Sequence, residues 1–196
     1  MLFSRTNATS WDGLDSAGDR PRPGKVSIRD AYPPPMPGAL LKETDHLTPD
    51  YRRFVEASPF LVVASAGADR VDCSPRGDGP GFVQVIDERT LLLPDQPGNN
   101  RLDTFHNLQA DPRVALLFLV PGIAEMLRIR GRAELQIGNL EERAPAALRI
   151  AVESVFFHCG RAIRKSGLWD PARHVLPHAV PSSREIMATI RQGERR

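Results

Sequence analysis

Short apolar segments, each bounded by turn residues, recur roughly every ten positions through the middle of the chain. Each is rich in Leu, Val, Ile or Phe and is long enough for one strand. This spacing is typical of an antiparallel sandwich or barrel. A parallel doubly wound sheet is disfavoured, because the strands do not alternate with long helices. The predicted strands are 60–65, 70–75, 82–86, 90–93, 114–120 and 126–135.

The cleanest alternation of apolar and polar positions lies in the strand predicted over 126–135, where the two sets of side chains point to opposite faces. The apolar set is Leu127, Ile129, Ala133 and Leu135, and the polar set is Arg128, Arg130, Arg132 and Glu134. The row of three arginines has two interpretations. It forms either a recognition surface for an anion or a carboxylate-bearing partner, or a solvated outer face.

Segment 148–157 fits two patterns. Leu148, Ile150 and Val152 alternate as in a strand, whereas Ala151, Val155 and Phe156 complete a helical face. The abundance of β-branched and aromatic residues favours a strand.

Four helices are predicted between and after these strands. The first spans 50–57, with Thr48 as N-cap and Pro49 at its first position. The second follows residues 99–101, carries Leu102, Phe105 and Leu108 on one face, and ends before Pro112. The others are a basic helix over 158–168, ended by Gly167, and a last helix over 186–192 capped by residues 182–185.

The turn Asn99-Asn100-Arg101 joins a predicted strand to the second helix. A helix start presents free backbone N–H groups and a positive dipole end, which together attract an anion. The turn is therefore a candidate phosphate site. The alternative is structural, because Asn is a good N-cap and Arg on a first turn is often only solvated.

Composition narrows the class of protein. The chain has 196 residues and a net charge of +2, too small to indicate nucleic acid or an anionic membrane as a partner. Cys73 and Cys159 lie far apart, which fits reduced thiols, and the scattered histidines predict no metal site. We expect a cytoplasmic protein, because the chain shows no secretory signal and no membrane-spanning run.

The organisation along the chain is asymmetric. Residues 1–40 are rich in Pro, Gly, Asp and Arg, and this composition predicts an N-terminal arm without a core of its own. Residues 41–196 form the predicted folded domain with C-terminal helices.

The order of these parts resembles the pyridoxamine 5′-phosphate oxidase-like family. Five stretches carry the resemblance: 74–78 (SPRGD), 92–101 (LLPDQPGNNR), 107–114 (NLQADPRV), 125–133 (EMLRIRGRA) and 158–169 (HCGRAIRKSGLW). Together they cover 48–171. The resemblance implies a mainly β fold with flanking helices, namely an antiparallel split β-barrel that binds flavin mononucleotide (FMN) at the interface of a homodimer. The 94–101 and 158–169 stretches look like one branch of FMN-dependent enzymes without a known substrate.

The resemblance also implies a division of the site. One subunit would hold the FMN phosphate through Asn99, Asn100 and Arg101, with Arg76 as a second cation. Pro94, Asp95 and the backbone near Ser74 and Gly77 would flank the ring. The second subunit would close the site with Glu125, Lys165, Ser166 and Trp169.

The implied function is an FMN-dependent oxidoreductase acting on a small molecule, with nicotinamide nucleotide at most a transient substrate because the chain has no GxGxxG turn. Vitamin B6 oxidases carry a basic residue where this chain has Thr104, and no substrate-phosphate arginine motif is found. No catalytic acid or base is assigned. The alternatives are a non-catalytic flavin-binding or redox-sensing protein, and a barrel that holds another flat cofactor such as a deazaflavin or haem.

Overall fold

One antiparallel sheet of eight strands dominates the computed structural model, which describes residues 32–96, 98–138 and 146–193. The strand order is β3-β2-β6-β7-β8-β5-β4, and β1 pairs with β8 outside this path. The strands are β1 (Glu43–Thr44), β2 (Phe60–Ala66), β3 (Val71–Gly77), β4 (Gln84–Asp87), β5 (Thr90–Pro94), β6 (Arg113–Leu119), β7 (Met126–Ile137) and β8 (Ala146–His158).

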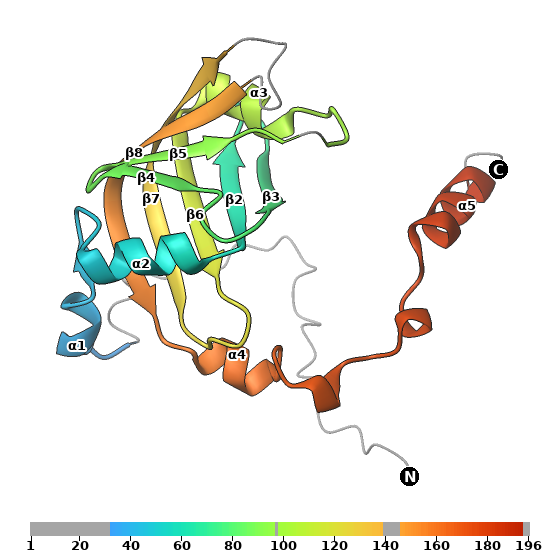
Figure 1. Cartoon of the computed structure of the whole chain (residues 1–196). Coiled ribbons are helices and arrows are strands. Elements are labelled where there is room, and N and C mark those ends of the chain that lie inside the picture. Colours follow the sequence, from blue (N-terminus) through green and yellow to red (C-terminus); the bar gives the residue numbers. More distant parts are fainter. Residues whose placement is uncertain (1–31, 97, 139–145, 194–196) are drawn as a thin grey trace, which may run out of the picture. The chain divides into compact units, whose positions relative to one another are not determined.

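The sheet rolls over on itself without closing. Strands β4 and β5 lie across β2 and β6, as Figure 1 shows, and residues of all these strands meet in one core. The end strands β3 and β4 are not paired with each other. An open, strongly curved antiparallel sheet with flanking helices confirms the predicted mainly β class and is consistent with a split barrel.

Helices occupy the ends of the rolled sheet and the C-terminal part of the chain. They are α1 (Pro37–Leu40), α2 (Pro49–Ala57), α3 (Asp103–Ala110), α4 (Arg161–Ser166) and α5 (Ser183–Gly193), with short 3-10 turns at Pro171–Arg173 and Pro177–Ala179. Figure 1 shows α3 and α4 near opposite ends of the strands. This placement follows from the order of the chain, because α3 leads into β6 whereas α4 follows β8, whose last residue lies opposite the first residue of β7.

The core lies between the two halves of the rolled sheet. Its largest fully buried side chain is Phe118, which lies between Leu61 of β2 and Leu127 of β7. Leu91 of β5 and Ile150 of β8 are a second fully buried pair. Helix α2 covers one side through fully buried Val55, and its Phe54 ring meets Phe157 edge-on at 5.7 Å between centroids. Burying these apolar groups provides the main driving force for folding.

Strands β7 and β8 are the longest pair, and a β-bulge interrupts their register. Arg130 lies opposite Ser154 and Gly131 lies opposite Val152, so Glu153 is an extra residue on β8. The core-facing positions of β8 therefore change from Leu148, Ile150 and Val152 to Val155 and Phe157. After the bulge, odd-numbered residues face the core in place of even-numbered ones. The apolar positions therefore also fit a helical pattern, although the predicted strand is confirmed.

Most element predictions agree with the structure, and the exceptions have local causes. β3 runs through Gly77, so Arg76 and Gly77 lie in a strand that extends beyond the predicted bounds 70–75. Helix α4 begins at Arg161, and His158, the first residue of the predicted 158–168 helix, instead ends β8. The α3 prediction was wrong at its start, because Leu102 is the N-cap in a left-handed conformation and is exposed.

The ends of the chain match the sequence analysis only in part. The predicted capping of the last helix is confirmed, since Ser182 and Glu185 exchange hydrogen bonds at the start of α5. Every residue from 171 to 193 is exposed. Most of the predicted N-terminal arm, residues 1–31, lies outside the described residues, and the short α1 and β1 were not predicted.

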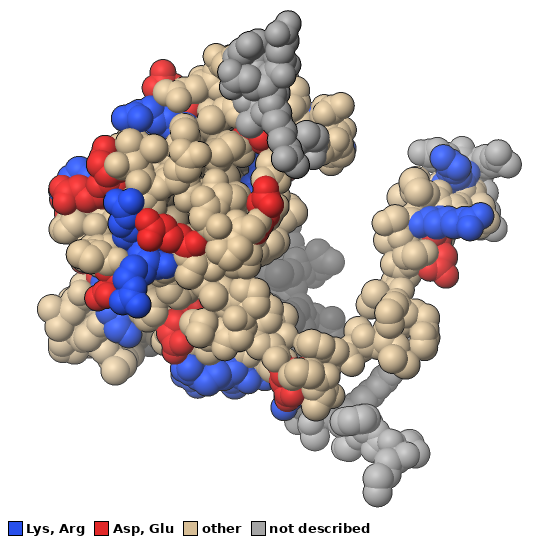
Figure 2. Space-filling model, in the orientation of Figure 1, with Lys and Arg blue, Asp and Glu red and all other residues tan. Residues whose placement is uncertain are grey.

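Charged side chains of both signs cover the face that carries α2 (Figure 2), where Arg52 bonds Glu56 and Arg89 bonds Asp45. Such mixing fits the small net charge of the chain. Among the described helices, none is long and apolar enough to cross a membrane. The described residues also include no cluster of three or more His, Cys, Asp or Glu side chains suited to a metal ion.

Gly131 is expected to tolerate no side chain. A Cβ at this buried position would lie 2.1 Å from the carbonyl oxygen of Ala151. Because this carbonyl belongs to the backbone of β8 and cannot turn aside as a side chain could, Gly131→Ala must distort the bulge. It should lower the free energy of unfolding by about 2 kcal/mol or more. Urea denaturation measures this change. The control is Gly79→Ala, which has open space around the new Cβ; equal stability of the two variants would contradict the prediction.

Candidate functional site

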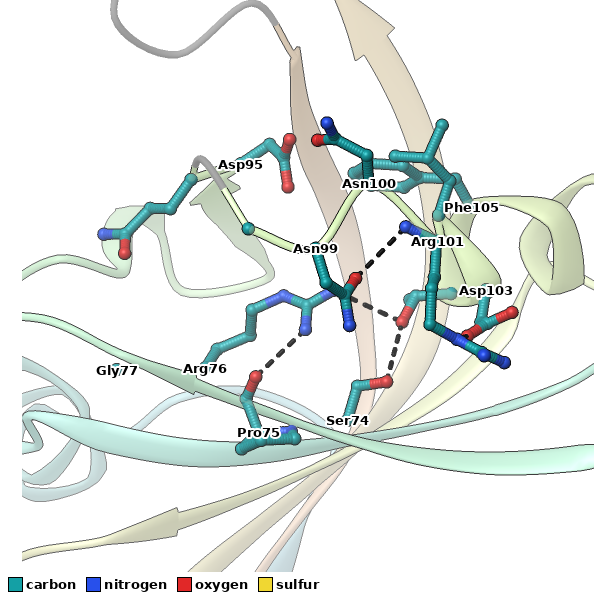
Figure 3. A pocket seen from close by; sticks show the side chains of 14 residues that line it. Ser74, Pro75, Arg76, Gly77, Asp95, Asn99, Asn100, Arg101, Asp103 and Phe105 are labelled. Atoms are coloured by element: carbon teal, nitrogen blue, oxygen red, sulfur yellow. Dashed lines mark hydrogen bonds and ion pairs between the residues drawn. The ribbon is translucent and has the colours of Figure 1, made fainter. Parts of the chain in front are cut away.

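A pocket of about 580 Å³ opens between β3, the loop after β5 and the start of α3 (Figure 3). Its volume is within the usual range for small-molecule sites. It is lined by Ser74, Pro75, Arg76, Gly77, Asp95, Gln96, Gly98, Asn99, Asn100, Arg101, Leu102, Asp103, Thr104 and Phe105.

Strand β3 supplies the floor of the pocket. Ser74 and Arg76 alternate along β3, opposite Val63 and Leu61 of β2, and so project to the core-facing side of the sheet. Arg76 Nη2 donates to Thr104 Oγ1 at 3.3 Å, and Thr104 Oγ1 donates to Ser74 Oγ at 3.3 Å. The chain of donors places a guanidinium and two hydroxyls at the base of the pocket.

The loop before α3 has an unusual backbone. Asn100 and Leu102 both have φ of 57°, in the left-handed region that few residues other than glycine adopt. Asn tolerates this conformation, but for Leu it carries strain of roughly 1 kcal/mol or more. The Asn99 side chain supports the loop by accepting a hydrogen bond from the Arg101 backbone N–H at 3.1 Å. Strained residues of this kind gather at binding sites.

The start of α3 leaves backbone donors free for a ligand. Its N-cap, Leu102, has no side-chain oxygen and makes no capping hydrogen bond. The first bond within the helix runs from the His106 N–H to the Leu102 carbonyl, so the three preceding amides have no side-chain cap. An uncapped helix start above a guanidinium is a favourable arrangement for an anion.

A buried amide fixes α3 against the sheet. The Asn107 side chain is 1% exposed. Its Nδ2 donates to Ser65 Oγ at 3.1 Å and to Asp72 Oδ2 at 2.8 Å, while its Oδ1 accepts from Arg70 Nε at 3.0 Å. These bonds join the helix to both β2 and β3. The position of the pocket loop relative to β3 therefore depends on Asn107.

The two arginines of the pocket differ in their partners. Arg101 Nε donates to Asp103 Oδ2 at 2.7 Å, and this hydrogen bond is the main reason that the pKa of Asp103 lies below its usual value. Figure 3 shows the Arg101 side chain turned toward Asp103. Arg76, by contrast, bonds to the Pro75 carbonyl and Thr104, and to no carboxylate within the described part of the chain. Its positive charge is thus the more available to an anionic ligand.

The structure brings together seven of the twelve site residues expected from the sequence. Those that line the pocket are Ser74, Arg76, Gly77, Asp95, Asn99, Asn100 and Arg101. Pro94 ends β5 one residue before the lining begins. The remaining four, Glu125, Lys165, Ser166 and Trp169, are not in the lining.

These four residues lie together near α4. Arg164 Nη1 donates to Glu125 Oε1 at 3.0 Å, a hydrogen bond that lowers the pKa of Glu125. Trp169 Nε1 donates to the Ile123 carbonyl at 2.8 Å, and Ser166 Oγ donates to the Ile163 carbonyl at 3.0 Å. Gly167 ends α4 in the left-handed conformation, which turns the chain toward Trp169. We call residues 123–125 and 161–169 the α4 cluster.

Thr104 and Phe105 line the pocket but were not predicted as site residues. Thr104 was noted only as a departure from a basic position, and Phe105 only as part of an apolar helix face. A signal was present, because the first turn of a helix that follows a candidate anion loop necessarily borders that anion. To use this signal one must know where α3 begins, and the sequence analysis placed that beginning too early.

Comparison with known proteins agrees with this architecture. The family model described as pyridoxamine 5′-phosphate oxidase matches residues 47–181. No curated protein matches the chain. Similar solved structures include HupZ of group A Streptococcus, with 15% identity and a TM-score of 0.46 over 56% of this chain and 92% of that one. A FAD-binding protein of Mesorhizobium loti has 16% identity and a TM-score of 0.41, over 58% and 96% of the two chains.

Removing the buried amide should loosen the pocket. Asn107→Ala deprives Ser65, Asp72 and Arg70 of a partner, so we expect the free energy of unfolding to fall by about 2–4 kcal/mol. Gln109→Ala, on the exposed side of the same helix, should change it by no more than about 0.5 kcal/mol. Urea denaturation of both variants tests this. A loss no larger for Asn107→Ala than for Gln109→Ala would show that the amide does not anchor α3.

Proposed function

Because the chain belongs to the pyridoxamine 5′-phosphate oxidase family, we propose that it is an FMN-dependent oxidoreductase whose pocket at α3 holds the cofactor phosphate. The observation that carries this proposal is the position of Arg76. Its guanidinium has no carboxylate partner among the described residues and lies below an uncapped helix start. Both features favour a doubly charged phosphate over a neutral ligand.

The residues of the pocket fit a phosphate monoester group by group. Arg76 supplies charge-assisted donors, Ser74 and Thr104 supply hydroxyls, and the first amides of α3 supply backbone donors. Arg101 is a secondary cation in this proposal, because Asp103 already neutralises it. The remaining lining, with Asp95 and Gln96, would border the part of the ligand nearer the ring.

The protein's own contribution would be binding and orientation. FMN, when bound, supplies the redox chemistry by accepting and releasing two electrons. The family includes oxidoreductases, and the proposed partners are a small-molecule substrate and a transient nicotinamide nucleotide as donor. Within the described residues, the titratable carboxylates of the pocket are Asp95 and Asp103. Asp103 is held ionised by Arg101, so we assign no proton transfer to it.

A second copy of the chain would complete the site. The α4 cluster and the pocket lie near opposite ends of the sheet (Figure 1) and share no lining residue. A homodimer of two-fold symmetry would let the α4 cluster of one copy face the pocket of the other. In this arrangement Trp169 and Lys165 of each copy would close the ring side of its neighbour's pocket.

The first test of the proposal compares FMN with riboflavin, which has the same ring without the phosphate. We expect wild-type protein to bind FMN more tightly. Arg76→Met should weaken FMN binding by roughly tenfold or more, the value of one charge-assisted hydrogen bond, and leave riboflavin binding nearly unchanged. Titration followed by flavin fluorescence measures both dissociation constants.

Arg53→Met is the control for this test, because Arg53 is a highly exposed cation on α2. It should bind both flavins like the wild type. An equal loss of FMN and riboflavin affinity in Arg76→Met, or no loss of either, would contradict the phosphate site at Arg76.

Turnover distinguishes an enzyme from a flavin-binding protein. We expect the FMN-loaded protein to be reduced by NADH or NADPH and reoxidised repeatedly by an added acceptor, with nucleotide consumption well above the flavin concentration. Absorbance of the nucleotide in anaerobic and acceptor-supplied assays measures this, with free FMN at equal concentration as the control. Tight FMN binding without reduction by either nucleotide would favour a flavin store or sensor.

A further inference from the structure

Asp95 directly follows β5, and the pairing of strands holds it at the pocket. Leu91 and Leu93 of β5 are buried in the core, and side chains two residues apart along an extended chain point the same way. The Asp95 backbone N–H donates to the Ala146 carbonyl at 2.8 Å, which continues the pairing of β5 with β8. Asp95 is half-buried and lines the pocket. Its carboxylate is therefore positioned by the sheet.

The polar groups closest to Asp95 along the chain are bonded elsewhere. Gln96 Nε2 donates to Asp78 Oδ2 at 2.6 Å. Arg101 Nε donates to Asp103 Oδ2 at 2.7 Å. Within the described ranges, no side chain forms a hydrogen bond or an ion pair with the Asp95 carboxylate. The carboxylate is thus the acceptor in the pocket lining that a ligand can use.

The pocket has a cationic end and an anionic end. Arg76 supplies the positive charge on β3, Arg101 and Asp103 neutralise each other, and Asp95 supplies the negative charge after β5. Figure 3 shows the Asp95 carboxylate apart from the Arg76 guanidinium. A ligand that satisfies both ends carries an anion on one side and a hydrogen-bond donor on the other. A phosphate placed beside Asp95 would meet a like charge, so the two ends also fix the orientation of the ligand.

We propose that Asp95 determines ligand specificity by accepting a hydrogen bond from a ring N–H of the bound ligand, at the end of the pocket away from the phosphate. This inference rests on the proposed function, because it takes FMN as the ligand. The flavin ring offers such a donor in its imide N–H, and a deazaflavin has the same group. An iron-loaded haem has no N–H at its edge, and its own carboxylates would meet Asp95 as like charges. Asp95 therefore selects a flavin-type ring over haem.

The value of this hydrogen bond lies in discrimination between ligands. A bond to a carboxylate is charge-assisted and corresponds to about tenfold or more in a dissociation constant. A ligand that lacks the N–H leaves the half-buried carboxylate without a partner, and a site built for a donor rejects such a ligand.

The test compares wild-type protein with Asp95→Asn, which keeps the size of the side chain and removes its charge. The ligands are FMN, riboflavin and FMN methylated at the imide nitrogen, and flavin fluorescence measures each dissociation constant. FMN and riboflavin should both bind about tenfold more weakly to the variant, because they share the ring. The methylated FMN should bind about tenfold more weakly than FMN to the wild type, and the substitution should change its affinity by no more than about threefold.

This pattern differs from the one expected for Arg76→Met, which weakens FMN binding alone. Asp50→Asn is the matched control, because it removes the same charge from a highly exposed position on α2. It should bind all three flavins like the wild type.

Three results would overturn the role of Asp95. A preference for FMN over the methylated FMN that persists unchanged in Asp95→Asn would show that the methyl group is excluded by crowding. Tighter binding of FMN to Asp95→Asn, with riboflavin unchanged, would place the carboxylate beside the phosphate. An equal loss of all three flavins would indicate a general disturbance of the pocket.

The reduction potential of bound FMN is an independent measurement of the same contact. The reduced ring carries more negative charge than the oxidised ring, so a carboxylate beside it lowers the potential. Asp95→Asn should therefore raise the potential, whereas Asp50→Asn should leave it unchanged. An unchanged or lower potential in Asp95→Asn would contradict a contact between Asp95 and the ring.

The two sets of variants separate this inference from the proposed function. A wild-type protein that binds neither FMN nor riboflavin overturns both. If Arg76→Met weakens FMN binding alone and Asp95→Asn changes no affinity, only the role of Asp95 is overturned. If Asp95→Asn weakens both flavins and Arg76→Met has no effect, the role of Asp95 is supported and the phosphate site is overturned.

Discussion

The side-chain amide of Asn107 is the interaction on which the candidate site depends. It is buried, it bonds to Ser65 on β2 and to Asp72 and Arg70 at the β3 side, and so it ties a helix to two strands. An amide in this position uses both its donor and its acceptor ends, which an apolar residue of similar size cannot do. The hairpin between β2 and β3 adapts to it as well, because a Cβ on Gly67 would lie 2.6 Å from Asn107 Oδ1. The distance from α3 to the Arg76 side of β3 is set by these contacts.

The two sides of the sheet carry different kinds of side chain. The core-facing side of β3 contributes the hydroxyl of Ser74 and the charge of Arg76 to the pocket. The outward side of the sheet carries the half-buried side chains of Leu117 on β6 and Phe156 on β8, with Arg128 of β7 between them. Within one chain, the pocket and the α4 cluster lie near opposite ends of the sheet and share no lining residue. A symmetric dimer, as proposed, would bring the α4 cluster of one copy to the pocket of the other.

The sequence alone predicted the meander of strands well, because its strands are short apolar segments bounded by turn residues, and the longest predicted one, within β7, alternates apolar and polar residues. The pocket was predicted less completely. Its β3 and loop residues could be named, since an Asn-Asn-Arg turn before a helix has a recognisable chemistry. The start of α3 could not be placed, because nothing in the sequence indicates that Leu102 adopts a left-handed backbone. Thr104 was consequently missed, and Arg101 was given the leading role that we now propose for Arg76.

The bulge at Glu153 has a consequence for comparing this chain with its relatives. A single extra residue shifts the reading frame of β8, so that Phe156 faces outward beneath Arg128 while Phe157 faces the core. A relative with one residue fewer at this point would need the opposite order of apolar and polar residues over the last third of the strand. An ungapped alignment would then match core positions with outward positions from Ser154 onward. Differences between relatives in this segment should be judged by the side of the sheet that each residue occupies, and not by residue number.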